Sequence, residues 1–153
     1  MTVPSALHRP RGIPLARRLT AAVAVLLARG IALLPPRRIR AVLTAVRRRS
    51  APATYEQAKA ARDAVCAASL GCAAPHGCLP RSLATALLCR MSGTWPVWCS
   101  GVRVAPPFGA HAWVEANGHP VDEAGPDGYF RCLISVGPAD ADRELNGRGA
   151  SRR

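Results

Sequence analysis

Acidic residues are missing from the first third of the chain. Residues 1–50 contain eleven arginines and no aspartate, glutamate or lysine, whereas residues 51–153 contain ten basic and nine acidic residues. The formal net charge of +12 is therefore a property of the N-terminal third. Charge alone would allow nucleic-acid binding, but no aromatic residues interleave with the arginines and no nucleic-acid-reading motif occurs. We therefore expect no nucleic-acid partner.

Metal-binding and membrane-spanning patterns are also lacking. No C-x-x-C pair occurs among the six cysteines, so we expect no metal site, and no motif indicates a cofactor. A chain of 153 residues that is 49% hydrophobic can fill a core without disulfides, which favours a reducing, cytoplasmic location. The apolar run at residues 19–28 is too short to cross a bilayer, and no small-x-small cleavage site follows it.

The patterning divides the chain into four parts. Residues 1–14 are predicted to be a flexible basic arm, residues 15–53 a basic helical segment, residues 54–136 the core, and residues 137–153 a disordered tail. Helices are expected from about residue 15 to 34, and again up to the arginines at 47–49. Thr54 and Gln57 form a capping box that opens a further helix, expected to run to about Leu70.

Strand-like segments dominate after Gly93. Residues 96–104, 110–116, 119–123 and 129–136 each read as a strand, and Asn117-Gly118 predicts a two-residue hairpin. Helices therefore come first and an antiparallel sheet follows, which predicts an α+β fold with a helix packed on a small sheet.

Cys78 is the candidate nucleophile. It begins an apolar helical segment in which Pro80 suits the first turn, and Gly93 suits the left-handed position that closes the helix. A thiol at the N-terminus of a helix lies at the positive end of the helix dipole, which lowers its pKa. The competing interpretation is a small hydrophobic core residue.

His111 is the candidate base, because it lies on a predicted strand while the other histidines lie in an arm or in loops. A cysteine hydrolase also needs a group that orients the base. With a two-residue hairpin turn, Asp122 shares the face of His111, and a three-residue turn would bring Glu123 there instead. Asp122 is favoured, and Glu123 is the alternative acid.

Several motifs resemble one family. Gly77-Cys-Leu-Pro-Arg-Ser, Gly101-Val-Arg103 and Pro107-Phe-Gly-Ala-His-Ala-Trp-Val-Glu115 are similar to those of the leader peptidase of lasso peptide biosynthesis, the stand-alone protease half of the split B protein. The resemblance covers roughly residues 15–136 and implies a transglutaminase-like cysteine protease fold. It places the family's cysteine on Cys78 and its histidine on His111.

The same resemblance implies an activity and partners. The family removes the leader from a ribosomally made precursor peptide, before an ATP-dependent cyclase closes the macrolactam. A small leader-binding recognition protein is implied as a further partner. From the residues alone, two other functions stay open: a non-catalytic basic scaffold that binds a peptide or an anionic surface, and acyl transfer to an amine. The basic N-terminal helices are explained by a solvated arginine face, by an acidic partner, or by contact with an anionic membrane surface.

Overall fold

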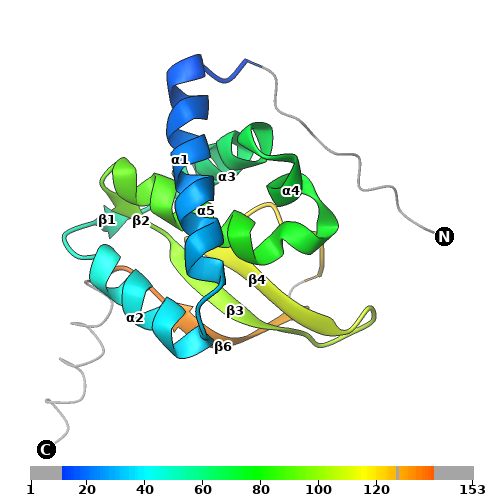
Figure 1. Ribbon diagram of the computed structural model, residues 1–153. Helices are drawn as coiled ribbons and strands as arrows, with labels where there is room; N and C mark the ends of the chain where they lie inside the picture. Colours follow the sequence, from blue (N-terminus) through cyan, green and yellow to red (C-terminus); the bar gives the residue numbers. More distant parts are fainter. Residues whose placement is uncertain (1–11, 127, 140–153) are drawn as a thin grey trace, which may run out of the picture.

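The structure is a computed structural model that describes residues 12–126 and 128–139. Within these residues, helical segments come first and a sheet follows, so the predicted α+β class is confirmed (Figure 1). The helices are α1 (Leu15–Ala32), α2 (Pro36–Val46), α3 (Tyr55–Ala68), α4 (Leu70–Ala73), the 3-10 turn η1 (Pro75–Gly77) and α5 (Cys78–Met91). The strands are β1 (Ala51–Pro52), β2 (Thr94–Trp95), β3 (Val97–Arg103), β4 (Gly109–Ala116), β5 (His119–Pro120) and β6 (Phe130–Val136).

Helix α5 is the centre of the core. It packs against α1 and α3 on one side and against β4 on the other. Its residues from Arg81 to Cys89 are all buried and most of them are apolar, as expected for a helix enclosed by other elements rather than an amphipathic surface helix. Trp98 on β3 ties the sheet to this helix, because its indole N–H donates to the hydroxyl of Ser82 at 3.1 Å.

The main sheet has the strand order β5-β4-β3-β6, and all its pairs are antiparallel. Between Ser100 and Gly101 the register of β3 against β6 shifts by a bulge. Gly101 is required there, because a Cβ atom at this position would lie 1.9 Å from the carbonyl oxygen of Arg131. A separate two-stranded parallel pair joins β1 to β2.

The Asn117-Gly118 hairpin has the predicted two-residue turn. Both residues have positive φ, 53° and 79°, and Ala116 pairs with His119. The return strand is shorter than predicted: it ends at Pro120 instead of Glu123. Asp122 then takes a φ of 52°, which turns the chain out of the sheet.

The helix opened by Thr54 has the predicted capping box. The Thr54 hydroxyl accepts from the Gln57 N–H at 3.2 Å, and the Gln57 side chain accepts from the Thr54 N–H at 2.9 Å. The helix ends at Ala68 rather than near Leu70, because Ser69 takes an extended conformation and caps α4. Helix α4 and the 3-10 turn η1 then lead the chain to Cys78.

Helix α1 belongs to the same core as α5, although the sequence suggested a separate segment for residues 15–53. Ala21, Ala24 and Ala28 are fully buried in the cluster that also contains Leu83 and Leu87. Most of the predicted arm and tail, residues 1–11 and 140–153, lies outside the described residues. Among the helices that are described, none is both long enough and apolar enough to cross a membrane.

Candidate active site

Cys78 is the first residue of α5, as the sequence predicts. The turn before it is tightly packed, since a Cβ atom on Gly77 would lie 2.0 Å from the carbonyl oxygen of Gly71. A larger residue at position 77 would therefore displace the start of the helix. Cys78 itself is only partly buried, whereas Cys72 and Cys89 are fully enclosed.

The thiol of Cys78 lies against His111 of β4. The hydrogen bond with His111 is the largest cause that lowers the pKa of Cys78, and it outweighs burial, which acts in the opposite direction. The backbone N–H of Ala112 and the positive charges of His111 and Arg81 lower the pKa further. The lowered pKa expected from the helix position is thus present, but its main source is the imidazole.

His111 is held in place by aromatic rings. Its side chain is 3% exposed, and its imidazole stacks on the ring of Phe130 with centroids 4.9 Å apart and planes 21° apart. Trp113 lies on the same strand face with a centroid distance of 5.9 Å. Burial lowers the pKa of His111, but the hydrogen bonds to Cys78 and Glu123 outweigh burial, and the net shift is upward.

Glu123 supplies the acid that contacts His111. Its Oε2 lies 2.8 Å from Nε2 of His111, and its side chain is 9% exposed. Its other oxygen, Oε1, faces two guanidinium groups, at 3.7 Å from Arg62 and 3.9 Å from Arg81. One carboxylate oxygen therefore orients the imidazole while the other is fixed by arginines.

Asp122, the acid favoured from the hairpin register, does not contact His111. Its carboxylate lies 2.7 Å from Arg62 and 3.8 Å from Lys59, and its side chain is 47% exposed. The register argument fails here because regular pairing stops at Pro120, and the positive φ of Asp122 breaks the alternation of side chains. The neighbouring Glu123 reaches the base in its place.

Three arginines of the site, Arg62, Arg81 and Arg103, were not predicted from the sequence. Arg81 is 8% exposed, and it donates to the carbonyl oxygens of Cys72 at 2.9 Å and Ala74 at 3.3 Å. It comes three residues after Cys78 on the same helix, and this spacing places both on one face, a signal that could have found it. Arg103, at the end of β3, has Nη2 3.3 Å from Nδ1 of His111 and forms no ion pair with a described residue.

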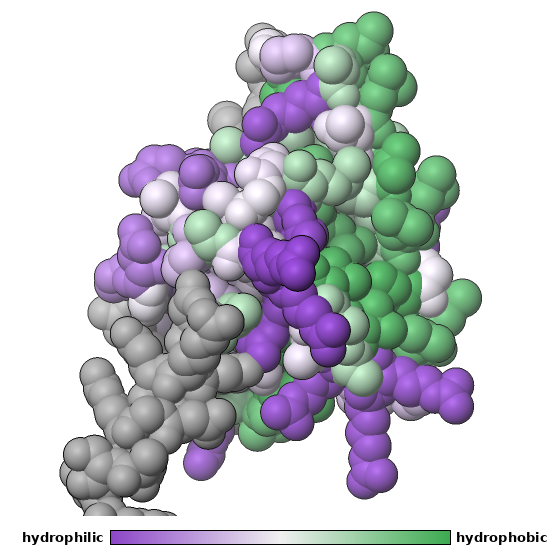
Figure 2. Space-filling view, turned by 90° about the vertical axis from the view of Figure 1, so that its left-hand side faces the viewer, coloured by the Kyte–Doolittle hydropathy of each residue, from purple (hydrophilic) through white to green (hydrophobic). Residues whose placement is uncertain are grey.

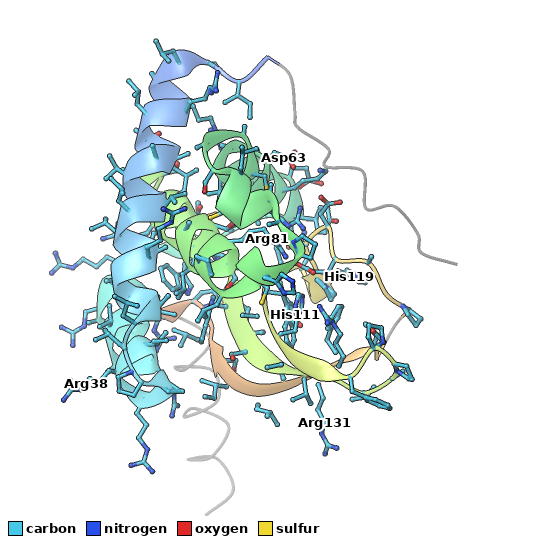
Figure 3. All side chains as sticks on the ribbon, turned by 45° about the vertical axis from the view of Figure 1, so that its right-hand side comes forward. Arg38, Asp63, Arg81, His111, His119 and Arg131 are labelled. Atoms are coloured by element: carbon cyan, nitrogen blue, oxygen red, sulfur yellow. The ribbon has the colours of Figure 1, made fainter. Side chains whose placement is uncertain are left out.

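Figure 3 shows Arg81 and His111 close together where α5 meets the sheet, while Arg131 points away from this junction. His119 lies on β5, directly after the hairpin turn. In residues 12–126 and 128–139, no group of three or more metal-ligating side chains has the arrangement of a metal site.

The other cysteines lack the environment of Cys78. Burial raises the pKa of Cys66, and it raises that of Cys89 to about 12. Burial and the neighbouring Glu115 raise the pKa of Cys99 as well. The thiolate form is therefore stabilised at Cys78 and destabilised at these three positions.

The arrangement is that of a nucleophile, a base and an orienting acid. Glu123 contacts Nε2 of His111, so Nδ1, which Arg103 Nη2 also approaches at 3.3 Å, is the ring nitrogen on the side left for the thiol. A proton can pass from the thiol to this nitrogen, and the resulting imidazolium is stabilised by the carboxylate. This chemistry suits attack on an acyl carbon.

One protein family matches most of the chain. Residues 21–135 match the sequence profile of a family described as the transglutaminase-like superfamily, Transglut_core3. No curated protein and no solved structure matches the chain at a significant level. The matched residues include α5, the main sheet and most of α1, so that Cys78, His111 and Glu123 all lie within the family domain. The chain belongs to the transglutaminase-like superfamily.

Proposed function

We propose that this protein is a cysteine peptidase that removes the leader from a ribosomally made lasso precursor peptide. The observation that carries the proposal is the Cys78–His111–Glu123 contact chain, in which the pKa of the thiol is lowered and that of the imidazole is raised. The motifs around Cys78 and His111, similar to those of lasso leader peptidases, support the choice of substrate.

In the proposed reaction, the Cys78 thiolate attacks the carbonyl carbon of the scissile peptide bond. The backbone N–H of Cys78, at the start of α5, is the proposed donor to the oxygen that becomes negative. The imidazolium of His111 gives its proton to the departing amine, which becomes the N-terminus of the core peptide. Water, deprotonated by His111, then hydrolyses the thioester and releases the leader with a free carboxylate.

The proposal includes partners. A small recognition protein would present the leader, and an ATP-dependent cyclase would use the freed amine to form the macrolactam. A gene neighbourhood that contains a short precursor, a small leader-binding protein and an asparagine-synthetase-like cyclase would support these assignments.

Cleavage of the neighbouring precursor tests the activity. The full chain is incubated with that peptide and the recognition protein, and the products are identified by mass spectrometry. We expect two fragments whose masses sum to the precursor plus one water, and no fragments with Cys78→Ala. Equal cleavage by Cys78→Ala would show that another group performs the chemistry. No cleavage by the wild type would refute the substrate assignment.

A further inference from the structure

The outward face of α1 is aliphatic, not basic. Six large apolar side chains on this face, or directly after the helix, have exposed fractions between 48% and 87%: Leu15, Leu19, Val23, Leu26, Leu27 and Leu33. We call these six residues the α1 ridge. The expectation of a solvated arginine face on this helix is therefore wrong for its most exposed side.

The α1 ridge follows the helical repeat. Consecutive members are one, three, four or six residues apart and, at 100° per residue, lie opposite the buried alanines Ala21, Ala24 and Ala28. At a rise of 1.5 Å per residue, the ridge extends about 27 Å along the molecule. Figure 2 shows a continuous hydrophobic band along this side, bordered by hydrophilic side chains. The buried residues of α1 are thus mostly alanines, whereas its leucines face solvent.

A contiguous apolar patch of this length marks an interaction surface. Its neighbours are cationic: Arg18 and Arg29 border the ridge on α1, and both are exposed. Beyond the end of α1, exposed Arg37, Arg38 and Arg40 follow on α2, and Figure 3 shows Arg38 pointing away from the body of the molecule. No acidic residue occurs before Glu56.

The arginines of α2 are poorly placed for the stability of their own helix. Arg37 and Arg38 lie in the first turn, where the helix dipole is positive, and this turn contains no acidic residue. The first turn of helix α1 likewise contains two arginines, Arg17 and Arg18, and no acidic residue. The arginines in the first turns of α1 and α2 add positive charge to the positive ends of these helices. An anionic partner outside the chain would compensate this charge.

We propose that the α1 ridge and the first turn of α2 dock onto an anionic lipid bilayer. Helix α1 lies in the plane of the interface, its leucines enter the acyl boundary, and the arginines contact headgroup phosphates. Long arginine side chains can keep their charge at the headgroups while their stems follow the apolar residues. This binding does not depend on the proposed peptidase reaction, because Cys78 is not part of the surface.

The composition of the ridge favours lipid over protein. Protein interfaces are enriched in aromatic residues and methionine, and the ridge contains neither. A second copy of the chain would bring arginine-bordered surfaces of equal charge together. A lipid bilayer fits both the aliphatic composition of the ridge and the positive charge around it, since it accepts aliphatic side chains without specific pockets and supplies negative charge.

Vesicle binding tests the proposal. The full chain is mixed with vesicles of phosphatidylcholine alone, or of phosphatidylcholine with phosphatidylglycerol, and bound protein is measured by sedimentation. We expect binding to the anionic vesicles that weakens as salt is raised, and at least tenfold weaker binding to phosphatidylcholine. Arg37→Gln combined with Arg38→Gln should reduce the preference for anionic vesicles.

Two matched variants test whether vesicle binding requires the α1 ridge or only any exposed apolar side chain. Leu26→Glu places a charge on the ridge, and Leu133→Glu places one on β6 at a residue of equal exposure, 66% against 68%. Leu26→Glu should weaken vesicle binding at least tenfold and Leu133→Glu should leave it unchanged, with circular dichroism verifying that both are folded.

If a partner other than lipid covers the α1 ridge, these experiments give different results. If the wild type does not bind anionic vesicles, or if both variants bind equally well, the lipid assignment is wrong. A wild type that elutes as a dimer and does not bind vesicles, with Leu26→Glu monomeric, would assign the ridge to a second copy and also overturn it.

Discussion

Replacing Glu123 by alanine separates the two acids that the hairpin presents. Glu123 accepts a hydrogen bond from buried His111 at 2.8 Å, whereas Asp122 pairs with Arg62 and Lys59 and is half exposed. A hydrogen bond to a charged group contributes about 1.5–3 kcal/mol. Since 1.4 kcal/mol corresponds to a factor of ten, Glu123→Ala should lower kcat/KM for precursor cleavage about 10- to 150-fold.

Asp122→Ala is the matched control at the adjacent position. Exposed ion pairs contribute only about 0–1 kcal/mol, and Asp122 does not contact His111, so activity should change by no more than about fivefold. Both variants are assayed with the same precursor under conditions in which each is folded. A large loss with Asp122→Ala and a small one with Glu123→Ala would refute the assignment of the orienting acid.

The pH profile gives an independent readout of the same variant. Activity rises as Cys78 ionises and falls as the His111 imidazolium loses its proton. The pKa of Cys78 is lowered and that of His111 is raised, and both shifts favour the thiolate–imidazolium pair. Glu123→Ala removes an acceptor and a negative charge that favour the imidazolium, and the alkaline limb should therefore move to lower pH. An unchanged alkaline limb would show that Glu123 does not act through His111.

Three further substitutions test the frame that holds the site. Thr54→Ala removes one half of the capping box and should cost about 0.5–2 kcal/mol, seen as a Tm lower by about 2–4 °C per kcal/mol, with activity retained. Gly77→Ala would place a Cβ atom 2.0 Å from Gly71 O and should abolish cleavage, whereas Gly30→Ala, where no atom lies within 4 Å, should not. Arg81→Met leaves the carbonyl oxygens of Cys72 and Ala74 without this donor, so chemical denaturation should show a loss of about 2–4 kcal/mol; unchanged stability would contradict its structural role.

Local sequence patterns predicted the positions of the site residues that lie on regular helices and strands. The start of α5 at Cys78 follows from the turn residues before it and from the apolar run after it. The placement of His111 on β4 follows from strand composition and from the Asn117-Gly118 turn, whose pairing of Ala116 with His119 is confirmed. These features depend on neighbours within a few residues in the sequence.

The orienting acid could not be predicted in the same way, because it lies beyond the end of the regular hairpin. A register argument assumes that alternation continues, and Asp122 ends it with a φ of 52°. The roles of Arg62 and Arg103 depend on contacts between distant segments, which no local spacing encodes. The aliphatic outer face of α1 was also missed, since periodicity identified the helix but not which of its two apolar sides faces the core.

Alkylation of the thiols by iodoacetamide, followed residue by residue with mass spectrometry over a range of pH, tests the central claim most directly. The account predicts that Cys78 reacts first, at a pH below the usual pKa of a thiol, and that His111→Ala removes this advantage. Cys66, Cys89 and Cys99 should react slowly, because burial raises their pKa. If Cys78 reacts no faster than exposed Cys132, or if His111→Ala leaves its rate unchanged, the site does not contain an activated nucleophile.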